Sequence, residues 1–334
     1  MKLSIIMGVY NTEKYLSDCL KSILDQQEFT QDDFEVICVN DGSTDNSGKI
    51  LEEYSKQYTS LKIINQENRG RTAALNVALS EASGKYLWTI NSDDFIDTSC
   101  FKFIIDTMEN NDIDCLVIER VRVPEDAKYI KKTQSYKFRE GRRNTSDSSA
   151  DTTHILLRKL VSENNILYEE DARNGGCDHL YLYELGKYWK KEVYTKSIHY
   201  YHRQRANSLA HIRDEKSANN RERTYRLMLE KFNSDLKECK DKKKRRNILE
   251  RKGLATQSIL NSYAINKSKN ERVNLLEDLK KDGYYPYDFV WWNLRPKLGI
   301  KRTLMDWCMF FFPIQNYYLF YAYVVNKLKN YNSK

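Results

Sequence analysis

Two adjacent carboxylates, Asp93 and Asp94, follow a short hydrophobic run in the segment WTINSDDF, residues 88–95. Carboxylate oxygens are the ligands that a hard divalent cation such as Mg²⁺ or Mn²⁺ prefers, and few of them suffice where substrate phosphates complete the shell. The pair therefore indicates a divalent-metal site that faces a phosphorylated substrate. The simpler alternative is that Asp94 caps the turn before Phe95.

Similar polar loops follow two earlier hydrophobic runs, at Tyr10-Asn11 and at Asn40-Asp41-Gly42-Ser43. Tyr10 offers an aromatic face on which a nucleobase could stack. Asp41 has two readings, contact with a ligand or an ordinary cap of the Asp-Gly-Ser-Thr turn. For Ser43 and Asp45 we favour helix capping over ligand contact.

These loops belong to a regular alternation of strands and helices over the first hundred residues. Hydrophobic periodicity predicts strands over 3–10, 34–40, 61–67 and 85–90, and helices over 12–26, 46–58 and 71–84. Such alternation predicts an α/β fold with a parallel sheet and helices on both of its faces. Ligands of such sheets bind beyond the carboxyl ends of the strands, so we expect the three polar loops to form one site.

The rest of the chain is less regular. Residues 124–152 are polar and weakly periodic, which predicts a loop or hairpin excursion beside the site. Residues 153–211 regain helix and strand character, and 216–281 look helical and strongly charged. Polar residues interrupt every twenty-residue window of 305–327, so this aromatic segment is not expected to span a membrane. It could lie in the membrane interface or pack on the catalytic domain as a helix.

Composition narrows the class of protein. The 334 residues are 40% hydrophobic and 31% charged with four prolines, as in globular proteins. Seven cysteines without a CxxC pair, and no signal peptide before LSIIMGVY, favour reduced thiols and a cytoplasmic chain. Residues 211–334 carry 27 Lys and Arg against 14 Asp and Glu. This basic rear suggests an anionic membrane surface, because no nucleic-acid-binding module is recognised.

Four segments, IMGVYN, VNDGSTD, NRGRTAALNVAL and INSDD, together resemble the family 2 glycosyltransferases in order and spacing. The family is inverting and has the GT-A (Rossmann-like) nucleotide-diphospho-sugar transferase fold. The resemblance covers about the first 210 residues. We therefore expect a catalytic domain over 1–215, a basic helical extension over 216–281, and an aromatic and basic tail over 282–334, on the inner face of the cell membrane.

The resemblance assigns roles to individual residues. It implies uracil recognition by Asp41 and metal binding by Asp93 first and Asp94 second, with Mn²⁺ or Mg²⁺ as the cofactor. Asn91 stands where the family has an acid that faces ribose. The segment HYYHRQRANSL, 199–209, is similar to the family's stretch beside the donor diphosphate, which implies phosphate contacts for His202 and Arg203.

Two further positions keep their alternatives. Arg71 could face phosphate or could be an exposed arginine at a helix start, and Asn76 could pin the loop before the metal strand that leads to Asp93. For the catalytic base, Gly176-Cys177-Asp178 stands where the family has Gly-Glu-Asp, which implies Asp178. The rival pair is Glu170-Asp171, but the helix after it would then begin eight residues too late. Cys177 beside an acid is not expected to be a nucleophile.

The function that we expect is metal-dependent transfer of a sugar from a nucleotide-diphosphate donor, UDP-linked, to a glycan or polyprenyl-linked acceptor of bacterial surface polysaccharide synthesis. Two alternatives remain. Asn40, Asn91 and Cys177 replace three acids of the family, which fits a nucleotide-sugar-binding protein with weak or lost transferase activity. A basic scaffold or nucleic-acid-binding protein is the other.

Overall fold

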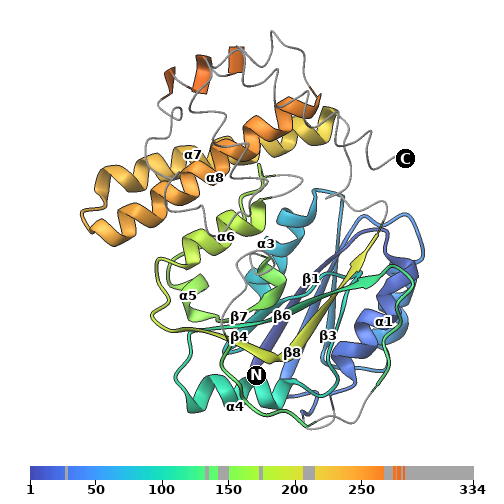
Figure 1. The fold of residues 1–334 in the computed structure, drawn as a ribbon. Helices are drawn as coiled ribbons and strands as arrows, with labels where there is room; N and C mark the ends of the chain where they lie inside the picture. Colours follow the sequence, from blue (N-terminus) through green and yellow to red (C-terminus); the bar gives the residue numbers. More distant parts are fainter. Residues whose placement is uncertain are drawn as a thin grey trace, which may run out of the picture. The chain divides into compact units, whose positions relative to one another are not determined.

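The computed structural model describes most of the chain: residues 1–26, 29–131, 135–141, 150–172, 176–205 and 215–266, together with 274, 275, 277–279, 281 and 282. The chain forms two compact units (Figure 1), Met1–Glu170 with Cys177–His211, and Asp171–Gly176 with Ile212–Lys334. The predicted membrane-associated tail lies outside the described residues except for Asp282.

The first half of the sheet is parallel, as predicted. Its strands are β1 (Leu3–Val9), β2 (Phe34–Asp41), β3 (Leu61–Gln66) and β4 (Tyr86–Thr89), in the spatial order β3-β2-β1-β4. The intervening helices are α1 (Glu13–Leu24), α2 (Ser47–Ser55) and α3 (Arg71–Glu81). All seven predicted elements are present, and α3 ends before the predicted stop because Ala82 is already extended.

Both faces of β1 are buried, and alternate side chains enter different cores. Leu3, Ile5, Met7 and Val9 pack with residues of α1 and of α4 (Phe101–Asn110). Ile6 points to the opposite face, where it packs with alanines and leucines of α3. This two-sided burial fixes the register of β1, so the carboxyl ends of β1, β2 and β4 are held at one edge of the sheet.

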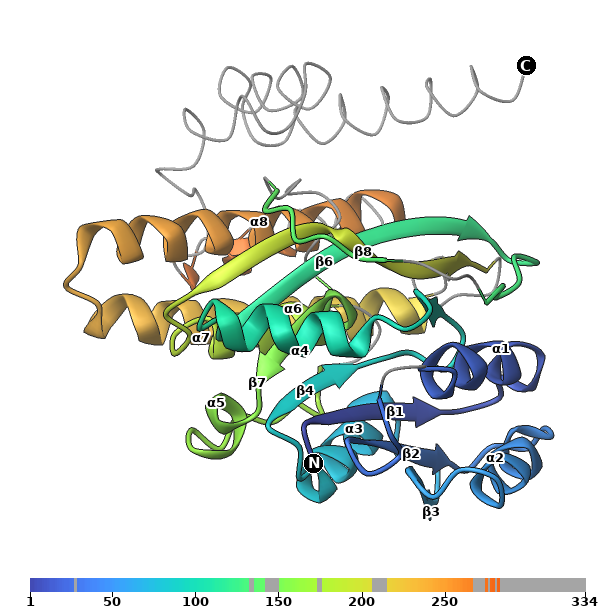
Figure 2. The ribbon, with the colours of Figure 1, turned by 90° about the horizontal axis from the view of Figure 1, so that it is seen from below.

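The second half of the sheet, beyond the four strands for which parallel pairing was predicted, is mixed. It is built from β5 (Phe95–Ile96), β6 (Cys115–Pro124), β7 (His154–Leu157) and β8 (Glu192–Gln204), and the full order is β3-β2-β1-β4-β7-β6-β8-β5. β7 is antiparallel to β4 and β6, whereas β8 runs parallel to β6 and antiparallel to β5. Figure 2 shows β6 and β8 running side by side.

Short elements surround this second half: the 3-10 helix η1 (Asp151–Thr153), α5 (Lys159–Ser162) and α6 (Cys177–Leu185). In the predicted excursion 124–152, β6 reaches Pro124, and residues 135–141 lie along β8, with one antiparallel bridge between Glu140 and Thr195. This bridge joins segments far apart in sequence and is not a hairpin, so the loop interpretation fits the described residues of the excursion, and η1 returns the chain to the sheet.

The second unit contains α7 (Glu215–Glu238) and α8 (Lys242–Asn266), which pack against each other (Figure 1). Residues predicted to be helical and charged thus form a helical hairpin. In the part of the chain that the structure describes, no helix combines the length and the apolar run that a membrane crossing requires.

Candidate functional site

The loops after β1, β2 and β4 meet at one edge of the sheet, as predicted. Asn11 accepts a hydrogen bond from the Thr44 amide at 2.8 Å, which joins the first loop to the second. Thr12 Oγ1 donates to Ser92 Oγ at 3.1 Å, which joins the first loop to the third. Tyr10 stands beside these contacts with 48% of its surface exposed, so its ring is accessible to a ligand.

Asp45 caps two helices, which confirms the capping interpretation. Its Oδ1 accepts from the Ser47 amide at 2.9 Å and its Oδ2 accepts from the Glu13 amide at 3.0 Å. The first turn of α1 is therefore satisfied from a different loop, and Thr12 at its N-cap makes no capping bond of its own. Ser43 was expected to cap but instead accepts from the Asn11 amide at 3.3 Å.

Asp41 does not cap the turn that follows it, because its carboxylate holds the loop before α3. Oδ1 accepts from Gln66 Nε2 at 2.7 Å and from the Arg69 amide at 2.8 Å, and Oδ2 accepts from the Gly70 amide at 2.9 Å. Gly70 has φ 95°, a backbone conformation that glycine adopts without strain. The buried Asp41 is thus the anchor of a preformed loop.

Asp94 is fully buried and fully hydrogen-bonded. Oδ2 accepts from Tyr200 Oη at 2.6 Å, Oδ1 accepts from the Arg203 amide at 2.9 Å, and His202 Nδ1 lies 3.3 Å from Oδ1. Burial opposes ionisation, but the hydrogen bonds from His202, Tyr200 and the Arg203 amide hold the pKa of Asp94 below its ordinary value. Asp94 therefore fastens the end of β4 to β8 and does more than cap a turn.

Asp93 differs sharply from its neighbour. Its side chain is 14% exposed, and Oδ2 forms an ion pair with Arg205 Nη2 at 2.5 Å. Burial, and then the charge of Asp94, raise the pKa of Asp93 to about 6. When a carboxylate is desolvated and lies next to a second carboxylate, any additional positive charge stabilises its ionised form.

Arg203 does not face a ligand, which corrects the predicted phosphate contact. Its guanidinium is buried against Phe95, with the guanidinium carbon 4.8 Å from the ring centroid. Nη1 donates to the Asp93 carbonyl at 2.7 Å, Nε donates to the Ala127 carbonyl at 3.1 Å, and Nη2 pairs with Asp18 at 3.0 Å. Arg205, two residues further along, has a partly exposed side chain and could contact a ligand.

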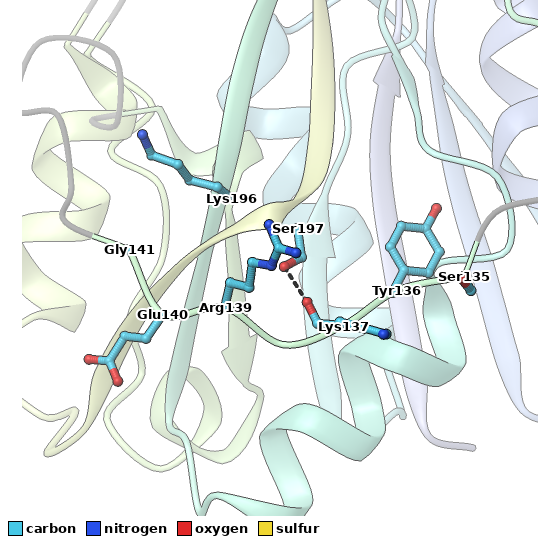
Figure 3. Close-up of a pocket in the computed structure, with 8 residues that line it drawn as sticks. All are labelled: Ser135, Tyr136, Lys137, Arg139, Glu140, Gly141, Lys196 and Ser197. Atoms are coloured by element: carbon cyan, nitrogen blue, oxygen red, sulfur yellow. Dashed lines mark hydrogen bonds between the residues drawn. The ribbon is translucent and has the colours of Figure 1, made fainter.

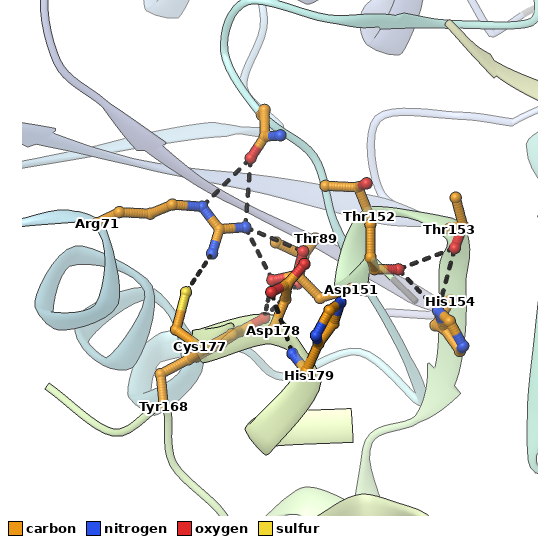
Figure 4. Close-up of polar contacts among 12 residues, drawn as sticks. Arg71, Thr89, Asp151, Thr152, Thr153, His154, Tyr168, Cys177, Asp178 and His179 are labelled. Carbon is orange, nitrogen blue, oxygen red and sulfur yellow. Dashed lines mark hydrogen bonds and ion pairs between the residues drawn. The ribbon is translucent and has the colours of Figure 1, made fainter. Parts of the chain in front are cut away.

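Arg71 is a hub and not a solvent-exposed arginine (Figure 4). Nη2 forms an ion pair with Asp151 Oδ2 at 2.8 Å, while Nε and Nη2 each lie 3.3 Å from Asn91 Oδ1. Although burial opposes it, the negative charge of Asp151 raises the pKa of Arg71. Tyr168 Oη donates to the same Asp151 carboxylate at 2.7 Å. The side chain remains 32% exposed, so it can still meet a ligand.

The two asparagines that replace acids both have defined partners. Asn91 accepts from Arg71 and donates from Nδ2 to Asp94 Oδ2 at 3.2 Å, which an acid could not do. Asn40 donates to Asn65 Oδ1 at 2.9 Å and accepts from the Ser43 amide at 3.2 Å. Both amides therefore fit the hydrogen-bond pattern around them, and Asn91 joins the Arg71 hub to the Asp94 cluster.

Asp178 lies in the first turn of α6, next to this hub. Figure 4 shows Cys177 and Asp178 at the start of the helix, with the Cys177 thiol directed at Arg71, whose Nη1 is 3.9 Å from Sγ. Burial raises the pKa of Cys177 to about 12, so the thiol is neutral and is not an activated nucleophile. Within the described residues, Asp178 accepts a hydrogen bond from the adjacent His179 amide.

The rival acids are occupied elsewhere. Glu170 pairs with Arg69 at 3.2 Å, and Asp171, in the second unit, pairs with Arg223 at 2.7 Å. Asn76 does not pin the loop before Asp93, because it exchanges two hydrogen bonds with the backbone of Tyr168, at 2.9 and 2.8 Å. It thereby holds the segment just before Glu170 against α3.

Sequence reasoning missed Asp151 and Arg205. Asp151 lies in the polar stretch interpreted as an excursion, and nothing in its local pattern marks a buried carboxylate. Arg205 was within reach, because a strand repeats its facing side chains every two residues and Arg205 follows Arg203 by two. No cluster of three or more His, Cys, Asp or Glu side chains within the described residues is arranged to hold a metal ion by itself.

Residues 4–167 match the profile described as Glycosyl transferase family 2. Among curated proteins, the uncharacterized glycosyltransferase EpsJ of Bacillus subtilis is 27% identical over 221 residues, which cover 63% of either chain. The poly(ribitol-phosphate) beta-glucosyltransferase of Bacillus spizizenii is 41% identical over 98 residues, which cover 29% of this chain and 15% of the relative. The alignments thus span less than two thirds of the relatives' lengths.

Two solved structures share the fold. Residues 1–349 of S. aureus TarS, in complex with UDP-GlcNAc, superpose with a TM-score of 0.55 at 20% identity, over 86% of this chain and 93% of that TarS fragment. The mannosyltransferase PcManGT of Pyrobaculum calidifontis, in complex with GDP-Man and Mn²⁺, superposes with a TM-score of 0.51 at 16% identity, over 98% and 87% of the two chains. The chain carries a family 2 glycosyltransferase domain, and its fold is GT-A.

Proposed function

We propose that this domain transfers a sugar from a UDP-linked donor to a bacterial surface glycan or a lipid-linked acceptor, with inversion and with the help of Mn²⁺ or Mg²⁺. The observation that carries the proposal is the contrast at the end of β4. Asp94 is saturated with hydrogen bonds, whereas Asp93 is desolvated and is balanced, within the described residues, by an ion pair with Arg205. This is the state expected of a carboxylate that receives a cation together with a diphosphate.

The side chains fit a hard divalent ion. Asp93 supplies an oxygen ligand, and His202, 22% exposed beside Asp94, is close enough to share in the site. A magnesium or manganese ion held by one or two protein groups takes its remaining ligands from substrate phosphates and water. When bound, the metal neutralises the negative charge that develops on the leaving nucleotide diphosphate. Asp94 then positions Asp93 and does not bind the ion.

The nucleobase would lie at Tyr10 and Asp41. Gln66 donates to Asp41 with its amide nitrogen, while its buried Oε1 has no hydrogen-bond partner among the described residues. A buried acceptor without a donor is unfavourable by about 1–3 kcal/mol. The imide N–H of uracil would supply that donor to Gln66 or to Asp41, and the exposed ring of Tyr10 would stack on the base.

The diphosphate would meet three basic side chains. When a metal ion replaces Arg205 beside Asp93, Arg205 would be free to contact a phosphate oxygen of the donor. Its guanidinium suits bidentate contact with phosphate. Arg71 and His202 border the same loop and retain partial exposure. The ribose would contact the side-chain amide of Asn91, whose oxygen already accepts a hydrogen bond from Arg71.

Asp178 would act as the catalytic base. Its carboxylate accepts the proton of the acceptor hydroxyl while that oxygen attacks the anomeric carbon and the nucleotide diphosphate departs, in a single displacement with inversion. Arg71 links this helix start to the donor loop through Cys177 and Asn91. The acceptor would therefore approach between the start of α6 and the Asp93 loop.

The comparisons and the distribution of charge support the proposed acceptor class and location. The relative from Bacillus spizizenii is named for a cell-surface polymer, poly(ribitol phosphate), and this supports a surface-glycan acceptor. Lys242, Lys244 and Arg246 are exposed at the start of α8, which suits the anionic cytoplasmic leaflet. We therefore place the enzyme in the cytoplasm, peripheral to the inner face of the membrane. Loss of membrane binding on deletion of residues 285–334 would support this placement.

A thermal-shift measurement tests the donor and metal assignments together. UDP-GlcNAc with Mn²⁺ should stabilise the protein, by about 2.7 kcal/mol at a hundredfold excess over Kd, and Mg²⁺ or Mn²⁺ should be required for the full effect. Asp93→Asn should lose the metal-dependent part. Asp106→Asn is the matched control, because Asp106 lies in an exposed ion pair with Lys102 on α4. No shift with any UDP-sugar would overturn the proposal.

The alternative, a binding protein with weak turnover, makes a different prediction. It expects the same thermal shift without release of UDP when an acceptor hydroxyl or water is present. The ordered partners of Asn40 and Asn91, and the contact of Cys177 with Arg71, favour an adapted site over a decayed one. Steady release of UDP would exclude the alternative.

A further inference from the structure

A second pocket lies outside the donor site, beside the first half of β8 (Figure 3). Its volume is about 470 Å³. None of its lining residues belongs to the loops that form the donor site. The lining side chains come from residues 135–141 on one side and from Lys196 and Ser197 on the other: Ser135, Tyr136, Lys137, Arg139, Glu140, Gly141, Lys196 and Ser197.

One wall of the pocket is fixed at both ends. Tyr136 Oη donates to the Thr98 carbonyl at 2.6 Å, and its ring packs 5.3 Å from that of Phe103. At the other end, the Gly141 amide donates to the Tyr194 carbonyl at 2.9 Å. A Cβ at position 141 would lie 3.0 Å from the Tyr194 ring, a tight contact that favours glycine at this close approach. The wall is therefore held before any ligand arrives.

Between these ends, side chains of β8 hold the backbone of the wall. Ser197 Oγ donates to the Lys137 carbonyl at 2.6 Å, a bond drawn in Figure 3, and Thr195 Oγ1 donates to the Arg139 carbonyl at 3.0 Å. Both acceptors are backbone atoms, so the side chains of Lys137 and Arg139 are left available. Residues two apart on an extended segment share a face, so Lys137 and Arg139 both line the pocket.

The opposite wall is shaped by an irregularity in β8. The pairing of β8 with β6 shifts its register between Thr195 and His199, and Lys196 and Ser197 lie in the extra stretch. Such bulges turn side chains away from the direction that the regular strand would give them. Lys196 lines the pocket from this irregular stretch, and Figure 3 shows its side chain extending away from those of Lys137 and Arg139.

The pocket carries a net positive charge. Lys137, Arg139 and Lys196 are exposed, and none has an ion-pair partner in the described part of the chain; Glu140 is the one acid of the lining. Ser135 adds a hydroxyl to the lining, whereas the Ser197 hydroxyl already donates its proton to the Lys137 carbonyl. Figure 3 shows the three cationic ends apart from one another, so they match successive phosphate groups along one chain, each of which a guanidinium or an ammonium group can recognise.

We propose that this pocket binds the phosphodiester groups of an anionic acceptor chain of the polyol-phosphate kind. This inference rests on the proposed transferase function, and it names the acceptor class that the donor site leaves open. The pocket would hold a phosphate of the chain while a sugar-accepting hydroxyl elsewhere on the same chain reaches Asp178. Binding should weaken with salt, because exposed charges are screened within about 10 Å at 0.1 M.

Fluorescence anisotropy with labelled poly(ribitol phosphate) tests the proposal directly. The triple variant Lys137→Gln, Arg139→Gln, Lys196→Gln should bind the polymer at least about tenfold more weakly than the wild type. The matched control is the triple variant Lys21→Gln, Lys49→Gln, Lys56→Gln, which removes equal charge from exposed lysines in or next to helices α1 and α2. It should remain within about twofold. UDP-GlcNAc hydrolysis, measured in parallel, should be unchanged in both variants.

Two results would overturn the inference: no polymer binding by the wild type, or an equal loss in the two triple variants, which would indicate general charge attraction. The paired assays also separate it from the transferase proposal. Hydrolysis without polymer binding would leave the transferase standing and remove this acceptor. Polymer binding without hydrolysis or metal-dependent donor binding would remove the transferase and leave a phosphate-binding pocket.

Discussion

Two groups of side chains at the end of β4 differ in how completely they are hydrogen-bonded. A supporting group, Asp94, Asp151, Tyr200 and Arg203, is buried and saturated with protein partners. A second group, Tyr10, Asp93, Asp178 and Arg205, which we propose to face the ligand and call the ligand-facing group, is more exposed and has few partners among the described residues. Residues of equal chemistry that are adjacent, or two apart, in sequence fall into different groups, so chemical type alone does not indicate the role.

The comparison predicts that substitutions in the two groups have opposite signatures. A change in the supporting group should lower the free energy of unfolding, because a buried polar partner is left unsatisfied. A change in the ligand-facing group should lower binding or turnover and leave stability nearly unchanged.

The largest expected effect is on turnover in Asp178→Asn. Loss of a general base should lower kcat by about 10³-fold, with the thermal shift caused by UDP-GlcNAc and Mn²⁺ preserved. Release of UDP in the presence of an acceptor is the measurement. Glu170→Gln is the control, because Glu170 is the rival acid and pairs with Arg69. A comparable loss in Glu170→Gln alone would transfer the role of base to that residue.

The next effect is on stability in Asp94→Asn. The amide keeps the shape but has one acceptor oxygen, so either Tyr200 Oη or the Arg203 amide loses its acceptor and meets an NH₂ group; we expect unfolding to become easier by about 3 kcal/mol in urea titration. Asp93→Asn should change it by less than about 1 kcal/mol, since its one ion pair lies at the open side. Equal losses in the two variants would contradict the division into two groups.

A pair of arginine-to-lysine changes sharpens the comparison along β8. Arg203→Lys should lower stability by roughly 2 kcal/mol, because one ammonium cannot serve the Asp93 and Ala127 carbonyls and Asp18 together. Arg205→Lys should instead raise the KM for the UDP-sugar about tenfold through loss of bidentate phosphate contact. If Arg203→Lys moved only KM, the buried assignment of Arg203 would be wrong.

The smallest effect concerns pH and His199, just outside both groups. Its Nδ1 lies 2.9 Å from Asp97 Oδ2, and this hydrogen bond raises the pKa of His199 above its ordinary value of 6.5. The stabilisation is therefore complete below about pH 6.5 and is lost as the pH rises through the folded-state pKa. His199→Gln should lose more stability at pH 6 than at pH 8.5, by less than about 1 kcal/mol. A pH-independent loss would contradict this linkage.

Local pattern was sufficient for the first half of the fold. Hydrophobic runs and helix signals predicted β1 to β4 with their helices, and parallel strands bring their carboxyl ends together whatever the loops contain. It was not sufficient for the second half, where β7 and β8 pair with distant strands in both directions. Whether Arg203 or Arg205 faces solvent depends on that pairing, and the burial of Asp151 depends on Arg71, eighty residues earlier.

The loop held by Asp41 has a kinetic consequence. Because the amides of Arg69 and Gly70 are already bonded to Asp41, this loop needs no ordering when the nucleotide arrives. The entropy of that segment was lost during folding, and the encounter with donor is not slowed by waiting for a rare loop conformation. Discrimination between uracil and other bases should then be expressed as a difference in how long the donor stays, not in how quickly it enters.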